Sequence, residues 1–265
     1  MISSNERKLC LSGWLMKNDA KNYNIPLKLQ KFLLFYESFS KVNGEKYDFS
    51  GLKGYKRGPV FSSVWGDYTK ERAAFDAAAA NAYMSNASSV NENIAVQSSF
   101  VVGVLSEDEL SNLTHKINIW SCKEDRILNG EFQVELNEKD FNSNDFQIMD
   151  MLAKMFPLQM IKDSSIIDID DHYFVLDKKD ANSLSNEQIK TLHMLCEKEE
   201  LHNPIYIVKG GSRTETIDNI FDMLPDIDDE DIRKITESAL EKVQDMSDED
   251  FDSIDFEDAF TGGEG

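Results

Sequence analysis

Apolar side chains recur at helical spacing along the first 120 residues of the chain. The clearest case is the segment that starts at Pro26, a first-turn proline, and runs to about residue 41. One broad face of this predicted helix carries Leu29, Phe32, Leu33, Phe35, Tyr36 and Phe39, and Lys28 projects onto the same face. The same spacing predicts helices over 5–17, from beyond Pro59 to about 84, and over 94–103.

Two further helices carry start signals. Ser106 and Glu109 form a capping box, and Leu105 with Leu110 forms a hydrophobic staple. Ser185 and Gln188 repeat the device later in the chain. A helix is therefore expected to begin after each serine.

From about residue 136 the pattern becomes mixed. Residues 142–156 read as a helix, and the β-rich runs 164–170 and 172–177 predict a hairpin around Asp170–Asp171. A third strand is expected within 203–211, followed by a helix over 213–225. The predicted fold class is α+β, mainly α, with a helical domain over 1–135, a smaller mixed α/β region over 136–225, and an acidic amphipathic helix and flexible tail over 226–265.

Charge is distributed unevenly. The formal net charge is -21, and residues 220–265 hold 17 acidic side chains against 3 basic ones. This argues against nucleic acid and anionic membrane surfaces as direct partners. Asp250, Phe251, Asp252, Ile254, Asp255, Phe256 and Phe260 alternate acids with apolar anchors, which is typical of an acidic interaction segment.

The sequence offers little catalytic chemistry. The three cysteines are far apart, and His193 and His202 lack the i, i+4 spacing of metal ligands. Neither a P-loop nor a nucleophile elbow is present. We therefore expect no enzyme activity, no metal and no cofactor. The N-terminus lacks a secretory h-region and no apolar run is long enough to span a membrane, so a cytoplasmic protein is expected.

Three short motifs occur in a recognisable order. The first is Leu27-Lys28-Leu29-Gln30-Lys31-Phe32 with Tyr36; the second is Tyr55 with Gly58-Pro59-Val60; the third is Leu110, Thr114-His115 and Trp120. Together they resemble the Panacea domain, the module of antitoxins in bacterial and phage toxin–antitoxin pairs. Where that family usually has Tyr-Tyr-Ala, this chain has Phe35-Tyr36-Glu37.

Each motif also has a purely structural interpretation. Lys28 could reach solvent at the end of its helix, or it could be held by a buried acceptor or stack over a ring such as Tyr55. Arg57-Gly58-Pro59 could form a turn and a helix start, and His115 could end a helix. The functional hypothesis is a polar cluster of Lys28, Gln30, Tyr36, Arg57 and His115 in an aromatic shell. The residues expected to bind a partner or organise the module are Lys28, Gln30, Lys31, Tyr36, Tyr55, Arg57, Gly58, Pro59, Thr114, His115 and Trp120.

The resemblance implies an antitoxin-type protein that neutralises a cognate toxin by direct contact. A toxin that acts on nucleic acid or nucleotides needs a basic active site, which the acidic segment would cover. One alternative is an adaptor that delivers a partner to a protease, so a protease or chaperone is a second expected partner. Another alternative is a phage-type acidic decoy that mimics DNA.

Overall fold

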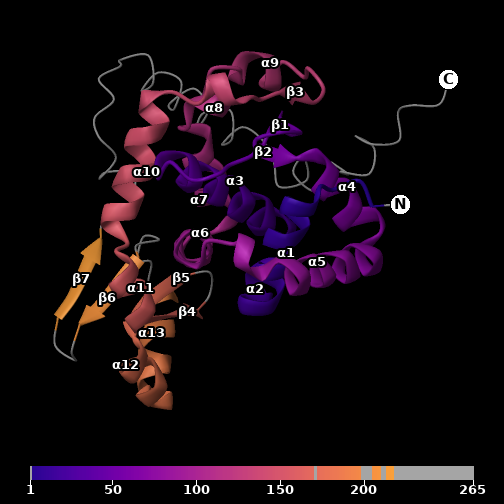
Figure 1. Ribbon diagram of the computed structural model, residues 1–265. Coiled ribbons are helices and arrows are strands. Elements are labelled where there is room, and N and C mark those ends of the chain that lie inside the picture. The colour runs from indigo at the N-terminus through magenta and orange to yellow at the C-terminus, as the bar shows by residue number, and fades with distance from the viewer. Residues whose placement is uncertain (1, 170–171, 198–204, 210–212, 218–265) are drawn as a thin grey trace. The chain divides into compact units, whose positions relative to one another are not determined.

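The computed structural model describes residues 2–169, 172–197, 205–209 and 213–217 (Figure 1). The chain divides into two compact units, 1–223 and 224–265, and the described residues all belong to the first. The fold is α+β and mainly α, as predicted. The predicted domain boundaries after residues 135 and 225 stay predictions, and the predicted acidic helix and tail lie outside the described residues.

The elements have the following bounds. The α-helices are α1 Glu6–Asn18, α2 Ala20–Tyr23, α3 Pro26–Val42, α4 Ser62–Lys70, α5 Arg72–Asn86, α6 Glu92–Val104, α7 Glu107–His115, α8 Asn118–Ser121, α9 Glu124–Leu128, α10 Ser143–Met155, α11 Leu158–Asp163, α12 Lys178–Ser183 and α13 Asn186–Glu197. The strands are β1 Leu52–Tyr55, β2 Gly58–Phe61, β3 Val134–Glu135, β4 Ser164–Ile169, β5 His172–Asp177, β6 Ile205–Lys209 and β7 Arg213–Ile217. Short 3₁₀ turns follow α5 (η1, Ala87–Ser89) and β3 (η2, Glu138–Asp140).

Helix α3 is the centre of the helical part (Figure 1). It packs against α1, α2, α4, α6, α7, α10 and β2. Its apolar side chains are almost fully buried, and so are Lys28, Lys31 and Glu37, each at 1% exposure or less. A helix covered on all sides needs apolar residues all round, and each charge on it needs a specific partner.

The helix predicted from beyond Pro59 to residue 84 is wrong in two respects. Gly58 and Pro59 begin strand β2, which pairs antiparallel with β1 in the register Tyr55↔Gly58, so Lys56 and Arg57 form a two-residue hairpin turn. Beyond the hairpin the helix is split at Glu71 into α4 and α5. Strand β3 pairs with the other edge of β1 and gives the order β2-β1-β3.

The mixed region forms a second sheet in the order β4-β5-β6-β7. The β4–β5 hairpin and the third strand are confirmed, and β6 runs parallel to β5 after the crossover that contains α12 and α13. The helix predicted to start at Arg213 is wrong over Arg213–Ile217, because this segment is strand β7, antiparallel to β6. A small core forms between the sheet and its helices from Ile169, Phe174, Leu176, Ile167, Ala181, Leu184, Ile189 and Leu192.

The predicted helix starts are confirmed in atomic detail. The Ser106 side chain accepts a hydrogen bond from the Glu109 backbone N–H, and Glu109 accepts one from the Ser106 N–H at 2.7 Å. Ser185 and Gln188 form the same reciprocal pair at α13. These local signals fix helix boundaries independently of the tertiary fold.

Candidate functional site

The turn of the β1–β2 hairpin packs against α3 and α7. Lys31 Nζ, in α3, donates a hydrogen bond to the Arg57 carbonyl oxygen at 2.7 Å. Gly58 has φ +100°, and a Cβ built on it would lie 2.3 Å from Lys31 Nζ and 2.5 Å from Thr114 Oγ1. Thr114 is fully buried in the last turn of α7 and hydrogen-bonds carbonyl oxygens of its own helix. Glycine at position 58 therefore satisfies both the backbone conformation and the available space.

A stacked ring pair supports the same turn from α7 and α8. The His115 and Trp120 rings lie 3.9 Å apart between centroids with an interplanar angle of 16°. The Trp120 indole N–H donates to the Tyr55 carbonyl oxygen at 3.0 Å, and His115 hydrogen-bonds the backbone of Lys56. His115 Nε2 is buried and has no hydrogen-bond partner among the residues that the structure describes. His115 ends α7, as one of its two sequence interpretations predicted.

The arrangement fixes a backbone turn and leaves two cationic side chains at the surface. Lys56 is exposed, and the Arg57 guanidinium, with its side chain 40% exposed, pairs with the exposed carboxylate of Asp108 at 2.7 Å. We call Tyr55, Lys56, Arg57 and Gly58 the hairpin tip. A tip held in one conformation can dock on a partner with little loss of conformational entropy.

Burial shifts the pKa values of the two titratable groups under the hairpin tip. Desolvation, together with the nearby charge of Arg57, lowers the pKa of Lys31 to about 7. Desolvation and the charge of Lys31 lower the pKa of His115 to about 3. At neutral pH the imidazole is therefore uncharged, which lets it stack on Trp120 without a buried charge.

The lowered pKa of His115 makes stability depend on pH. An unfolded histidine titrates near 6.5, so between about pH 6.5 and pH 3 the unfolded chain binds a proton that the folded chain does not. The contribution of neutral His115 to the free energy of unfolding is complete above pH 6.5 and is lost as the pH falls from 6.5 towards 3. We expect the wild type to lose about 2 kcal/mol more than H115F between pH 7 and pH 5, measured by urea unfolding. Equal losses in the two proteins would contradict this titration.

The other predicted residues of the cluster lie elsewhere. Gln30 Oε1 accepts a hydrogen bond from the Phe61 N–H at 2.8 Å, and the Tyr36 hydroxyl accepts one from the Asn91 N–H at 2.8 Å. Lys28 does not reach solvent: its Nζ lies 4.7 Å from the Tyr173 ring centroid, so the stacked ring belongs to β5 and not to Tyr55. The structure therefore places Lys28, Gln30 and Tyr36 apart from Arg57 and His115, and the five residues do not form the predicted polar cluster.

The sequence interpretation missed a buried ion cluster around Glu37. This carboxylate is fully buried and accepts hydrogen bonds from the Arg7 guanidinium at 2.8 Å, from the Lys8 ammonium and from the Asp48 N–H at 2.9 Å. Lys8 is 1% exposed, also donates to the Asp48 carbonyl oxygen, and lies 4.2 Å from the Phe61 ring centroid. The sequence feature that could have predicted this cluster is a single glutamate, Glu37, within the apolar helix α3, because a buried carboxylate requires a cationic partner.

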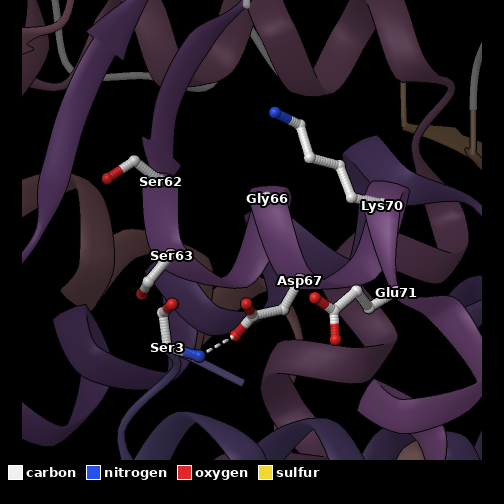
Figure 2. Close-up of a pocket in the computed structure, with 7 residues that line it drawn as sticks. All are labelled: Ser3, Ser62, Ser63, Gly66, Asp67, Lys70 and Glu71. Carbon is white, nitrogen blue, oxygen red and sulfur yellow. Dashed lines mark hydrogen bonds between the residues drawn. The ribbon is translucent and has the colours of Figure 1, made fainter. Parts of the chain in front are cut away.

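A shallow hollow of about 290 Å³ lies beside helix α4 (Figure 2). Figure 2 shows Asp67 among its lining residues, and one Asp67 carboxylate oxygen accepts a hydrogen bond from the Ser3 N–H at 2.8 Å. The same oxygen accepts from the N–H and hydroxyl of Ser4 at 2.7 and 2.6 Å. Asp67 thus ties the segment before α1 to α4, which is a structural role.

Two further features are absent from the described part of the chain. None of its helices combines the length and apolar character that crossing a membrane requires. Within the same residues, no group of three His, Cys, Asp or Glu side chains is placed to hold a metal ion. The predicted tail contacts, from Asp250 to Phe260, lie outside the described residues.

Comparison with known proteins gives one partial match. Residues 197–257 match a family model described as "Putative transposon-transfer assisting protein" (TTRAP). The match covers less than a quarter of the chain, includes strands β6 and β7, and extends into the acidic segment. No curated protein and no solved structure gives a significant match.

Proposed function

We propose that this chain is an antitoxin-type binding protein that neutralises a cognate toxin by direct protein contact. The observation that carries the proposal is the convergence of three segments that resemble Panacea motifs. Lys31 from α3, Gly58 from the hairpin, and Thr114 with Trp120 from α7 and α8 meet around one turn. A shared site explains why these residues occur together in one chain better than three separate structural roles do.

Charge supports the same proposal. The acidic segment suits a toxin whose active site is basic, since opposite charge speeds encounter and apolar side chains between the acids can anchor the complex. The hairpin tip would add a rigid contact, because its backbone is held by buried hydrogen bonds. In this mechanism the segment covers the active site and the folded body sets the orientation.

Removing the acidic segment is expected to weaken neutralisation. A chain ending at Pro225 should bind its toxin at least tenfold more weakly, and its affinity should vary less with salt, because the steering charge is gone. The measurement is the dissociation constant at 50 and 300 mM salt, together with growth rescue in cells that express the toxin. Full rescue of growth by the shortened chain would show that residues 226–265 do not take part in neutralisation and only keep the protein in solution.

The hairpin tip has its own test. R57A removes an exposed ion pair worth about 0–1 kcal/mol, so the thermal midpoint should hardly change while toxin binding weakens. K154A removes another exposed pair, in α10, and should leave both stability and binding unchanged. Normal neutralisation by R57A would exclude the hairpin tip from the interface.

The adaptor alternative makes a different prediction for the partner. A stoichiometric blocker leaves toxin levels constant, whereas an adaptor shortens the toxin's half-life in a protease-dependent way. Following the toxin by immunoblot after synthesis is stopped separates the two. We expect a stable complex, and rapid protease-dependent loss would favour the adaptor.

The TTRAP match favours a second candidate, an assisting role in the transfer of a mobile element. It concerns residues 197–257, so deletion of that segment should reduce transfer frequency in a mating assay while R57A should not. The reverse pattern, or no change with either variant, would count against the transfer role.

A further inference from the structure

Two large exposed apolar side chains, Leu128 and Phe132, lie four residues apart in the segment that leads from α9 to β3. Leu128 ends α9 and Phe132 follows four residues later in the connection to β3; they are 48% and 59% exposed. Single exposed apolar residues are common on protein surfaces, but a leucine and a phenylalanine exposed in one short connection give it two apolar anchors within five residues. Among the described residues they account for two of the five large hydrophobic side chains that are exposed.

The connection that carries Phe132 is held in a defined conformation. The Arg126 guanidinium pairs with the Glu131 carboxylate, with Nε donating at 2.7 Å, and the Glu131 N–H donates to the Arg126 carbonyl oxygen at 3.0 Å. Gly130 has φ +85°, and Gln133 has φ +49°, which is uncommon for a residue other than glycine. Gly130 and Gln133 thus define the path of the backbone on either side of Phe132.

Helix α9, which precedes this connection, packs on strand β1. Ile127 is buried, and its Cδ1 lies 2.4 Å from a Cβ built on Gly54 in β1, so α9 packs directly on the hairpin sheet. Val134 and Glu135 continue the connection into β3, which pairs with β1 (Figure 1). Leu128 and Phe132 therefore project from a rigid base, and docking them costs little ordering entropy.

The first turn of α9 carries two acidic side chains. Glu124 and Asp125 precede Leu128 by four and three residues, which places them on the same face of α9. Glu131 pairs with Arg126, and Glu135 lies 3.8 Å from Lys53 Nζ, so Glu124 and Asp125 carry the excess negative charge of this segment. We name Glu124, Asp125, Leu128 and Phe132 the α9 surface.

We propose that the α9 surface binds a basic amphipathic helix of a partner protein, with Leu128 and Phe132 as its anchors. The apolar pair fits the hydrophobic face of such a helix, and the acidic rim fits its lysines or arginines. A second copy of this chain is a poor occupant, because each copy carries a net charge of -21. This inference rests on the proposed function in one respect, namely that the helix would belong to the toxin.

The test uses the full chain and an 18-residue amphipathic helical peptide of lysine and leucine as probe. Hydrogen exchange should show protection of residues 124–133 when the peptide is added. The peptide concentration for half-protection should rise at least tenfold in L128A/F132A and in E124Q/D125N. Leu128, Phe132 and Asp125 are exposed and Glu124 is partly buried, so a thermal melt of each variant checks that the fold is intact. M84A, which shortens a side chain that is 76% exposed elsewhere, should behave as wild type.

Three results would overturn the proposal. The first is protection confined to residues 226–265, the second is equal protection in wild type and L128A/F132A, and the third is concentration-dependent dimerisation that F132A abolishes. The peptide assay needs no toxin, so it is separable from growth rescue. If the peptide protects residues 124–133 but the chain does not restore growth of cells that express the toxin, the α9 surface is supported and the antitoxin function is contradicted. If L128A/F132A restores growth fully and binds the toxin with unchanged affinity, the α9 surface is excluded as a binding site and the antitoxin function is supported.

Discussion

Replacing Glu37 with alanine is expected to lower the free energy of unfolding by about 3–5 kcal/mol, the largest effect of any substitution considered. The substitution leaves the Lys8 ammonium at 1% exposure with no carboxylate beside it and removes the acceptor of the Asp48 N–H. Breaking a buried pair by removing one partner leaves an uncompensated charge. Urea unfolding followed by circular dichroism gives the value directly.

Matched variants distinguish the buried cluster from ordinary ion pairs. D150A removes a pair in α10 whose side chains are 56% and 75% exposed, so it should cost no more than about 0.5 kcal/mol. The double variant K8M/E37L replaces the buried charges with apolar groups and should recover much of the stability that E37A loses. An E37A loss no larger than that of D150A would contradict the burial of this cluster.

Replacing Gly58 with alanine is expected to cost about 3 kcal/mol and to lower the thermal midpoint by roughly 6–12 °C. Two costs add. Residues other than glycine rarely adopt φ near +100°, and a Cβ at this position would lie only 2.3 Å from Lys31 Nζ. Lys31 cannot move aside cheaply, because it is buried and bonded to the Arg57 carbonyl oxygen. Differential scanning calorimetry measures the shift.

Gly44 provides the control for this effect. It has φ +71°, yet a Cβ built there has nothing within 4 Å, so G44A carries the backbone cost alone, about 1–2 kcal/mol. The difference between the two variants reports the crowding under the hairpin tip. Equal losses for G58A and G44A would mean that Lys31 and Thr114 do not close on Gly58.

Local chemistry predicted the starts of α3 and α7 because their signals are short-range. Pro26 at the start of α3 and the Ser106–Glu109 capping box act within a few residues, and both appear as expected. The β1–β2 hairpin was missed because its strands have four residues each and contain Gly54, Gly58 and Pro59, which are weak strand formers. Its pairing also depends on β3, about eighty residues further along the chain.

The candidate site was predicted only in part for the same reason. Lys31, Gly58, Thr114 and Trp120 do surround one turn, whereas Lys28 binds Tyr173, a residue 145 positions away that no motif connects to it. The ion partners of Glu37 likewise come from α1. Such pairings are set by tertiary packing, which periodicity along one helix does not encode.

We propose that this chain binds and silences a protein toxin. Isothermal titration of the full chain with the product of the neighbouring open reading frame tests it most directly, alongside growth of cells that express that product. We expect a saturable complex that weakens as salt rises, and restored growth when both proteins are present. Two folded proteins that give no binding heat, with growth still arrested on co-expression, would contradict it.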